Sequence, residues 1–239
     1  MSQERDLYSV VSCIGLSNEP ILFPEENVEL LKYIYDNLKN FKSPKEYPDA
    51  YFIDGETLFL FEHFKFYNGK LTEKGSEQAC DFSRIDKRIK ETIAKGENIN
   101  GLTFISNVVK NGNTYEENFS TQFDKHQSKI DTYISTMKKE LSRDFKKVYV
   151  GFVIEDASEL GTYIPNVGLL NLLRTTALKN KFLSSQKLDF IFFAMTHSDA
   201  NFVSFVTKSV MEKQSDEKLL DVKTIGSFSG QEQTVFFIN

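Results

Sequence analysis

PDAYFIDGETLFLFEHFKFY, residues 48–67, is the stretch that decides the fold of this chain. Asp54-Gly55 predicts a tight turn, because Gly tolerates the positive φ that a hairpin turn needs. The residues on either side, about 49–53 and 57–67, are rich in the aromatic and branched side chains that suit a pleated, half-buried surface. The stretch therefore predicts two antiparallel strands joined by a tight turn.

Charged side chains interrupt this apolar ribbon at Asp49, Glu62 and His63, and Lys65 follows closely. Burying a carboxylate is costly unless it is paired or coordinates a metal. Alternation along the second strand places Glu62 and Phe64 on one face, and His63 and Lys65 on the other. Because both faces are otherwise apolar, we expect the strand to be covered on both sides, as in the middle of a mixed sheet.

Asp49 and Glu62 are expected to lie roughly opposite each other when the two strands pair about the turn. Two carboxylates at that separation repel unless positive charge lies between them, and Mg²⁺ takes such hard oxygen ligands. A bound divalent ion can polarise a phosphodiester and activate a water molecule. The alternative is structural, because Pro-Asp often forms a turn before a strand and a Glu in a strand can pair with a buried Arg or Lys.

The rest of the chain alternates between helical periodicity and short apolar runs. The pattern predicts helices over about 24–42, 83–95, 117–144, 165–183 and 199–213, and buried strands over 147–154 and 188–195; residues 7–16 predict a short strand or a buried extended segment. This order favours one α/β domain over residues 1–239, with a mixed central sheet flanked by helices. Its core would comprise about 24–67 and 117–239, with an inserted segment at about 68–116.

Composition limits the classes of function. The 239 residues carry a net charge of −5, so any nucleic-acid surface must be a local patch. Cys13 and Cys80 are far apart and lack metal-ligand spacing, which predicts neither a disulfide framework nor a zinc site. We therefore expect a reducing, cytoplasmic location. The N-terminus does not resemble a signal peptide, and no segment approaches the ~20 apolar residues of a membrane span.

The arrangement of these elements resembles the PD-(D/E)XK nuclease superfamily. The resemblance covers about 24–156 and rests on Pro48-Asp49 on one strand and Glu62-His63-Phe64-Lys65 on the next, between a preceding helix and a following helix and strand. The EHFKF segment also resembles the EHFEF-type motif of uncharacterised bacterial and phage proteins grouped with that superfamily. The resemblance implies a restriction-endonuclease-like α-β-β-α-β core.

The resemblance also implies the chemistry of a site. Asp49, Glu62 and Lys65 would be catalytic, with Asp49 and Glu62 holding Mg²⁺ or Mn²⁺. A lysine would stabilise the attacking hydroxide or the developing phosphorane charge. Glu29 matches the place on the first helix where some members carry a further acid.

The chain departs from the family pattern at the lysine, which belongs two residues after the Glu, where Phe64 stands. Three explanations are open. A β-bulge at 62–65 could turn Lys65 toward the site. Lys125 or Lys129 of the following helix could supply the cation. The site could instead be inactive, with the fold serving to bind a partner.

The two histidines near this motif have structural interpretations. A single His on a strand, such as His63, is usually a packed or hydrogen-bonded residue, although it remains a candidate for the site. His126 falls on the apolar stripe of the 117–144 helix, so we expect it to pack.

The residues and the resemblance together favour two functions. The first is a Mg²⁺-dependent endonuclease that hydrolyses DNA phosphodiesters. The second is a catalytically inactive nuclease-fold module that binds a protein or nucleic-acid partner. The Asp49–Glu62 hairpin favours the first, whereas the acidic net charge and the displaced lysine favour the second. A phosphate-ester hydrolase unrelated to nucleic acid is a third, weaker alternative.

Overall fold

The computed structural model describes residues 2–15, 21–22, 28–97, 103–106, 112–158, 172–196, 201–222 and 234–237. The chain divides into two compact units. Unit 1 comprises Met1–Phe66, Ser120–Ala157 and Asn171–Asp221, and unit 2 comprises Tyr67–Phe119, Ser158–Leu170 and Val222–Asn239. Among the helices of the described ranges, none is long and apolar enough to cross a membrane.

Unit 1 is built on a six-stranded mixed sheet in the order β1-β9-β8-β7-β3-β2. Its strands are β1 (Ile21–Leu22), β2 (Ala50–Asp54), β3 (Thr57–Phe66), β7 (Lys147–Asp156), β8 (Phe190–Thr196) and β9 (Asn201–Thr207). Strands β3, β7 and β8 run parallel, while β2 and β9 pair antiparallel on either side of them. The predicted α/β class with a mixed central sheet is therefore confirmed.

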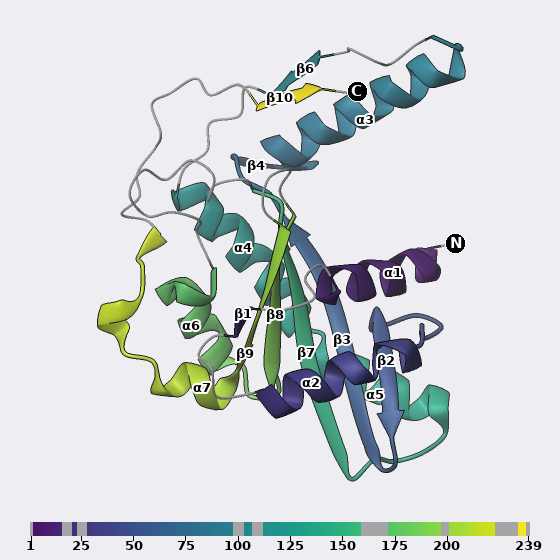
Figure 1. Ribbon diagram of the computed structural model, residues 1–239, viewed down its shortest axis with the longest axis vertical. Coiled ribbons are helices and arrows are strands. Elements are labelled where there is room, and N and C mark those ends of the chain that lie inside the picture. The colour runs from purple at the N-terminus through teal and green to yellow at the C-terminus, as the bar shows by residue number, and fades with distance from the viewer. Residues whose placement is uncertain are drawn as a thin grey trace. The chain divides into compact units, whose positions relative to one another are not determined.

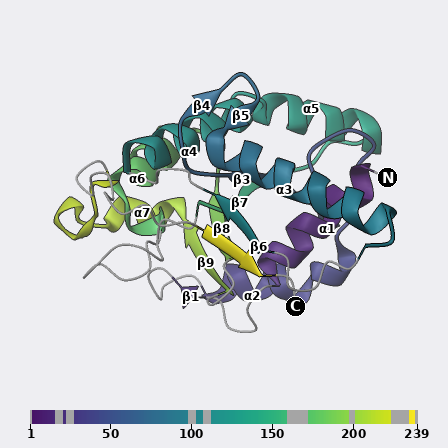
Figure 2. The ribbon, with the colours of Figure 1, turned by 90° about the horizontal axis from the view of Figure 1, so that it is seen from above.

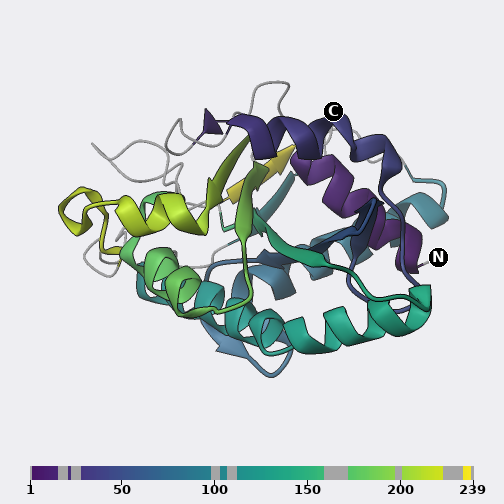
Figure 3. The same cartoon turned by 90° about the horizontal axis from the view of Figure 1, so that it is seen from below.

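Helices cover both faces of this sheet (Figure 1 and Figure 3). The helices of unit 1 are α1 (Ser2–Ile14), α2 (Val28–Asp36), α5 (Ile130–Leu141), α6 (Thr176–Ser184) and α7 (Lys208–Lys213). The unit also contains the C-terminal part of α4 (Gly112–Gln127) and short 3₁₀ helices at Leu38–Asn40, Leu172–Arg174 and Asp216–Lys218. On one face α1 and α2 pack on Phe59 and Phe61 of β3. On the other, Phe123 of α4 contacts Phe64 and Phe152 edge-on. Strand β3 is covered on both sides, as predicted.

The hairpin forms as the sequence predicts. Strands β2 and β3 pair from Ala50↔Phe61 to Asp54↔Thr57, and Gly55 adopts a φ of 54° in the turn. Strand β3 then pairs with β7 without interruption from Thr57↔Lys147 to Phe66↔Asp156. This continuous register leaves no β-bulge at 62–65, so Lys65 keeps the strand orientation that alternation gives it.

Three predicted elements differ from the structure. Residues 7–16 were expected to be a strand or an extended segment, but residues 7–14 belong to α1, because Val10 and Ile14 are four positions apart and both fully buried on one helical face; residue 16 lies outside the described ranges. The predicted 117–144 helix is two helices, α4 and α5, separated by a turn at 128–129 where the Ser128 hydroxyl donates to a backbone carbonyl. Residues 201–207 are strand β9, since pairing with β8 overrides their helical pattern.

The other predicted boundaries are close to those observed. The strands expected at 147–154 and 188–195 are β7 and β8. The helix expected at 24–42 is α2 followed by a 3₁₀ turn, and that expected at 165–183 is α6; residues 24–27 and 165–171 lie outside the described ranges.

Unit 2 contains α3 (Glu77–Ala94), the N-terminal part of α4, and the short strands β4 (Leu71–Thr72), β5 (Gly75–Ser76), β6 (Thr103–Ser106) and β10 (Thr234–Phe237). Strands β6 and β10 pair antiparallel and lie beside α3 (Figure 2). Ser76 caps α3 by accepting a hydrogen bond from the Ala79 amide at 3.2 Å. The segment 68–116, predicted as an insertion, belongs to this unit.

Candidate functional site

Strand β3 carries polar side chains on both of its faces within the four residues 62–65. Glu62 and Phe64 face α4 and α5, whereas His63 and Lys65 face the side covered by α1. The alternation of a regular strand produces this division. Four consecutive residues therefore contribute to two separate clusters, both within unit 1.

The Glu62 cluster is buried. The Glu62 carboxylate receives hydrogen bonds at Oε1 from His126 Nδ1 at 2.7 Å and from the Tyr133 hydroxyl at 2.6 Å. The second oxygen, Oε2, is also buried and has no hydrogen-bond partner within the described part of the chain. A buried carboxylate oxygen without a donor is costly, so this atom is where a ligand would be stabilised.

Asp49 approaches the same cluster from the start of the hairpin. Its Oδ2 accepts a hydrogen bond from the His63 backbone amide at 2.6 Å, which fixes the carboxylate against β3. The pKa of Tyr133 is raised well above that of a free phenol. The largest cause is burial, followed by the charge of Glu62 and its hydrogen bond, and then by the charge of Asp49. Both carboxylates therefore act on one hydroxyl, which stays protonated and donates to Glu62.

The ring of Phe64 stacks on His126, with centroids 5.0 Å apart and planes inclined by 14°. Phe64 stands where the family pattern has a lysine, and it holds the imidazole against Glu62 instead. His126 was expected only to pack; it packs on Phe64 and also hydrogen-bonds the carboxylate.

The second cluster joins α1, β3 and β7. Glu155 Oε2 lies 3.1 Å from His63 Nε2 and 3.9 Å from Cys13 Sγ, and the thiol lies 3.7 Å from the same His63 nitrogen. Lys65 Nζ donates to the other oxygen, Glu155 Oε1, at 2.7 Å. A thiol, an imidazole, a carboxylate and an ammonium group thus meet beside the sheet.

The pKa values of two groups in this second cluster, Glu155 and Cys13, are strongly shifted. Burial would raise the pKa of Glu155, but the hydrogen bond from His63 and the charge and hydrogen bond of Lys65 outweigh burial and lower the pKa to about 2. Burial and the charge of Glu155 raise the pKa of Cys13 to about 12. Without a further positive charge, Cys13 is a protonated thiol and a poor nucleophile.

A nucleophilic Cys-His-Glu triad does not fit this geometry. In such a triad one imidazole nitrogen faces the nucleophile and the other faces the acid. Here Nε2 of His63 faces both Cys13 and Glu155.

The structure brings together only part of the predicted site. Asp49 and Glu62 lie near the Tyr133 hydroxyl, but Lys65 lies on the opposite face of β3, paired with Glu155. The remaining predicted residues, Glu29, Lys125 and Lys129, are exposed on α2 and around the end of α4. No lysine among the described contacts of Glu62 supplies the cation of the family pattern.

The sequence did not predict the contacts that make each cluster. In the expected 117–144 helix, His126 and Tyr133 are seven positions apart and would share one face. In the structure they lie on α4 and α5, and the two helices bring them within 3.5 Å of each other. Glu155 ends a buried strand, a common position for site residues, whereas Cys13 gave no signal.

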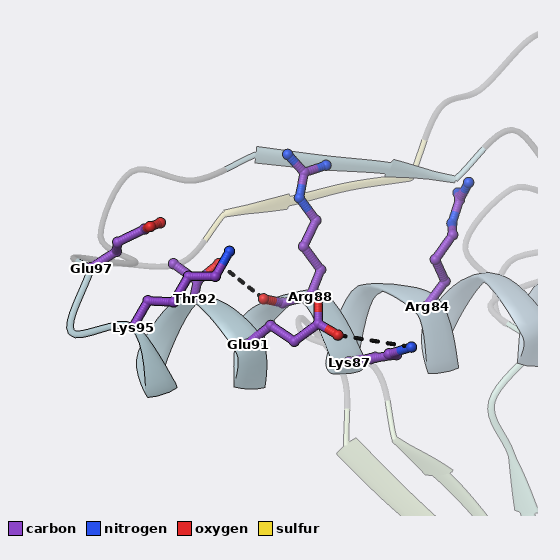
Figure 4. A pocket seen from close by; sticks show the side chains of 7 residues that line it. All are labelled: Arg84, Lys87, Arg88, Glu91, Thr92, Lys95 and Glu97. Carbon is purple, nitrogen blue, oxygen red and sulfur yellow. Dashed lines mark hydrogen bonds and ion pairs between the residues drawn. The ribbon is translucent and has the colours of Figure 1, made fainter.

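Unit 2 carries a separate polar hollow of about 490 Å³ on α3, lined by Arg84, Lys87, Arg88, Glu91, Thr92, Lys95 and Glu97 (Figure 4). Arg84 and Arg88 project to the same side of the helix. Arg84 pairs with Asp81 at 3.1 Å and Lys87 with Glu91 at 3.8 Å. The hollow is a local cationic surface of the kind that contacts phosphates, with much of its charge balanced along the helix.

Comparisons with protein-family models, with curated proteins and with solved structures found no match to this chain. The candidate sites therefore rest on the residues and geometry of the chain itself.

Proposed function

We propose that this protein is a metal-dependent nuclease in which Asp49 and Glu62 hold Mg²⁺ or Mn²⁺. The observation that carries the proposal is the buried Glu62 Oε2, which has no hydrogen-bond partner in the described ranges and lies in a cluster that Asp49 also approaches. Carboxylate oxygens are the ligands that Mg²⁺ prefers.

The residues of the site have complementary tasks in this proposal. His126 and Tyr133 both donate to Glu62 Oε1, which orients the carboxylate and directs Oε2 away from them. The His63 amide orients Asp49 in the same way. A bound Mg²⁺ would polarise the scissile phosphate and activate a water molecule.

His126 would replace part of the role of the family lysine. Its Nδ1 donates to Glu62 Oε1 at 2.7 Å, and the ring of Phe64 stacks on the imidazole. It would lower the negative potential of the two carboxylates and so favour the approach of a phosphodiester. Lys65 would contribute less, because it faces away and pairs with Glu155.

A second function is favoured by a specific observation. The ion pair between Lys65 and Glu155 withdraws the motif lysine from Asp49 and Glu62. A nuclease-fold module that has lost catalysis and binds a protein or nucleic-acid partner would have this arrangement.

The test is cleavage of plasmid DNA and of single-stranded DNA with Mg²⁺ or Mn²⁺, comparing the wild type with Asp49→Asn and Glu62→Gln. Glu56→Gln is the matched control, since Glu56 is an exposed carboxylate in the turn of the same hairpin. We expect metal-dependent cleavage that both site variants lose and the control retains.

Two results would contradict the nuclease. One is the absence of cleavage on either substrate by a folded wild-type chain, which would favour the binding module. The other is cleavage that persists in Asp49→Asn and Glu62→Gln, which would trace the activity to another site or to a contaminant.

A further inference from the structure

We infer that Cys13, His63 and Glu155 form a binding site for Zn²⁺ that fastens α1 to strands β3 and β7. The inference is independent of the proposed nuclease, because these side chains lie on the other face of β3 from Glu62. Each ligand comes from a different element of unit 1, so the ion would join three segments that are distant in sequence.

The separations of the three donor atoms match those around a tetrahedral zinc ion. Zinc lies about 2.3 Å from a thiolate sulfur and about 2.0 Å from an imidazole nitrogen or a carboxylate oxygen, so tetrahedral geometry separates its donors by roughly 3.3–3.6 Å. The observed separations are 3.7 Å for sulfur to nitrogen, 3.9 Å for sulfur to oxygen and 3.1 Å for nitrogen to oxygen. Movements of a few tenths of an ångström would complete the geometry.

The chemical type of the donors selects the metal. Thiolate and imidazole are soft and borderline ligands that favour Zn²⁺ over Mg²⁺ or Ca²⁺, which require oxygen ligands. The two faces of β3 would therefore take different ions. Oxygen donors at Asp49 and Glu62 suit a hard cation, and the mixed donors at Cys13, His63 and Glu155 suit zinc.

The residues around the cluster support the ligand geometry. Lys65 binds Glu155 Oε1, so that Oε2 is the oxygen presented to Cys13 and His63. Asp49 accepts a hydrogen bond from the His63 backbone and fixes this part of the strand. Such supporting contacts hold ligands in position before a metal binds.

Burial gives the ion a structural task. Cys13 is only 4% exposed, and the side chains of Glu155 and His63 are 11% and 15% exposed. Cys13 of α1 and Glu155 of β7 lie together in this cluster, with Sγ 3.9 Å from Oε2. On binding, zinc would replace the proton of the Cys13 thiol, which is released to solvent, and would be held by the resulting thiolate, the neutral imidazole and the carboxylate. It would stabilise the folded state by binding it in preference to the unfolded chain. Three protein ligands leave the fourth position to water or another small donor.

The experiment uses the full chain without an affinity tag, stripped with a chelator and titrated with Zn²⁺ or with Co²⁺ as a spectroscopic substitute. We expect one equivalent of metal per chain by mass spectrometry of the metal content. We also expect a sulfur-to-cobalt charge-transfer band together with the intense visible bands of four-coordinate cobalt. Cys13→Ser should lose the charge-transfer band, and His63→Gln should weaken binding at least tenfold.

Cys80→Ser is the matched control, since Cys80 is the second cysteine of the chain and lies in unit 2. It should keep both the stoichiometry and the cobalt spectrum. Glu62→Gln should also keep them, which separates failure of the zinc site from failure of the nuclease. Hydrogen exchange in α1 should be slower with zinc than without it.

The inference is overturned if the wild-type chain binds no zinc or cobalt, or if the cobalt spectrum lacks the sulfur band. It is also overturned if Cys13→Ser and His63→Gln, shown to be folded by circular dichroism, bind metal as the wild type does, because the metal would then be an adventitious ion only. Should Cys13→Ser fail to fold, the cobalt spectrum of the wild type and the behaviour of His63→Gln decide the question.

Discussion

Two carboxylates, Glu62 of β3 and Glu155 of β7, lie on opposite sides of the sheet and are bound in different ways. On one face, Glu62 is bound by an imidazole and a phenol from α4 and α5, and one of its oxygens has no partner in the described ranges. On the other face, Glu155 is bound through both oxygens, by an ammonium group, an imidazole and a thiol. The contrast teaches that a contiguous motif, EHFK, can contribute to two sites because neighbouring strand residues point in opposite directions.

The largest effect is expected in the rate of DNA cleavage when Glu62 is changed, if the face of β3 that carries Glu62 is the catalytic one. Glu62→Gln keeps the shape of the side chain and removes the charge that a hard cation needs. We expect metal-dependent DNA cleavage to fall at least about 100-fold, since the metal supplies the activated water and the charge stabilisation. Initial rates under saturating Mg²⁺ or Mn²⁺ measure the effect. Loss of rate in Glu56→Gln as well would point to a general effect of charge on DNA binding.

The next largest effect is expected in the free energy of unfolding, to which the contacts of Glu155 contribute. Glu155→Gln in chelator-treated protein leaves His63 and Lys65 without their carboxylate, and we expect the free energy of unfolding to fall by on the order of 2 to 3 kcal/mol. Urea denaturation measures the change. Glu56→Gln removes only an exposed ion pair with Lys146, so its change should stay below about 0.5 kcal/mol. Equal changes in the two variants would show that the buried pairing of Glu155 stabilises the fold no more than an exposed ion pair does.

The Glu155 carboxylate also makes the free energy of unfolding depend on pH. The folded pKa of Glu155 is about 2, depressed from an ordinary value of 4.5, with Cys13 facing it from α1 and His63 and Lys65 facing it from β3. Its contribution is present above pH 4.5 and is lost as the pH falls through the folded pKa. The difference in unfolding free energy between chelator-treated wild type and Glu155→Gln should therefore narrow from pH 5 toward pH 2. A difference that is constant over this range would contradict the assigned pairing.

A smaller effect is expected from the phenol that contacts Glu62. Tyr133→Phe removes one of the two donors to the buried carboxylate, and we expect a loss of about 1 to 2 kcal/mol in unfolding free energy. Tyr8→Phe is the matched control, because Tyr8 is 73% exposed on α1. Thermal or urea unfolding of both variants gives the comparison, and equal stabilities would mean that the hydroxyl is replaceable by solvent.

The smallest expected effect is the difference in cleavage rate between variants of the two basic side chains nearest the motif, His126 and Lys65. His126→Gln should lower the cleavage rate more than Lys65→Gln, because His126 contacts Glu62 and Lys65 faces the opposite side. We expect the two rates to differ about tenfold, which corresponds to about 1.4 kcal/mol of transition-state stabilisation. A larger loss in Lys65→Gln would place the catalytic cation on the Glu155 face and would overturn the division of the two sites.

Much of the fold follows from local patterns in the sequence. The hairpin, β7 and β8 were predicted near their observed positions, because an Asp-Gly turn and short apolar runs are local signals. The segments 7–16 and 201–207 were not, since each contains β-branched and aromatic residues whose local pattern fits more than one structure. For these segments, packing of α1 on the sheet and pairing of β9 with β8 decided the outcome.

The candidate sites divide in the same way. The sequence by itself determined that Glu62 and Lys65 face opposite sides of their strand, because the two-residue period of a strand is a property of the backbone. Only the tertiary structure decided that His126 and Tyr133 meet Glu62, and that Cys13 and Glu155 meet His63. Those contacts join residues 50 to 92 positions apart, and strand pairing and helix packing, rather than local spacing, bring such residues together.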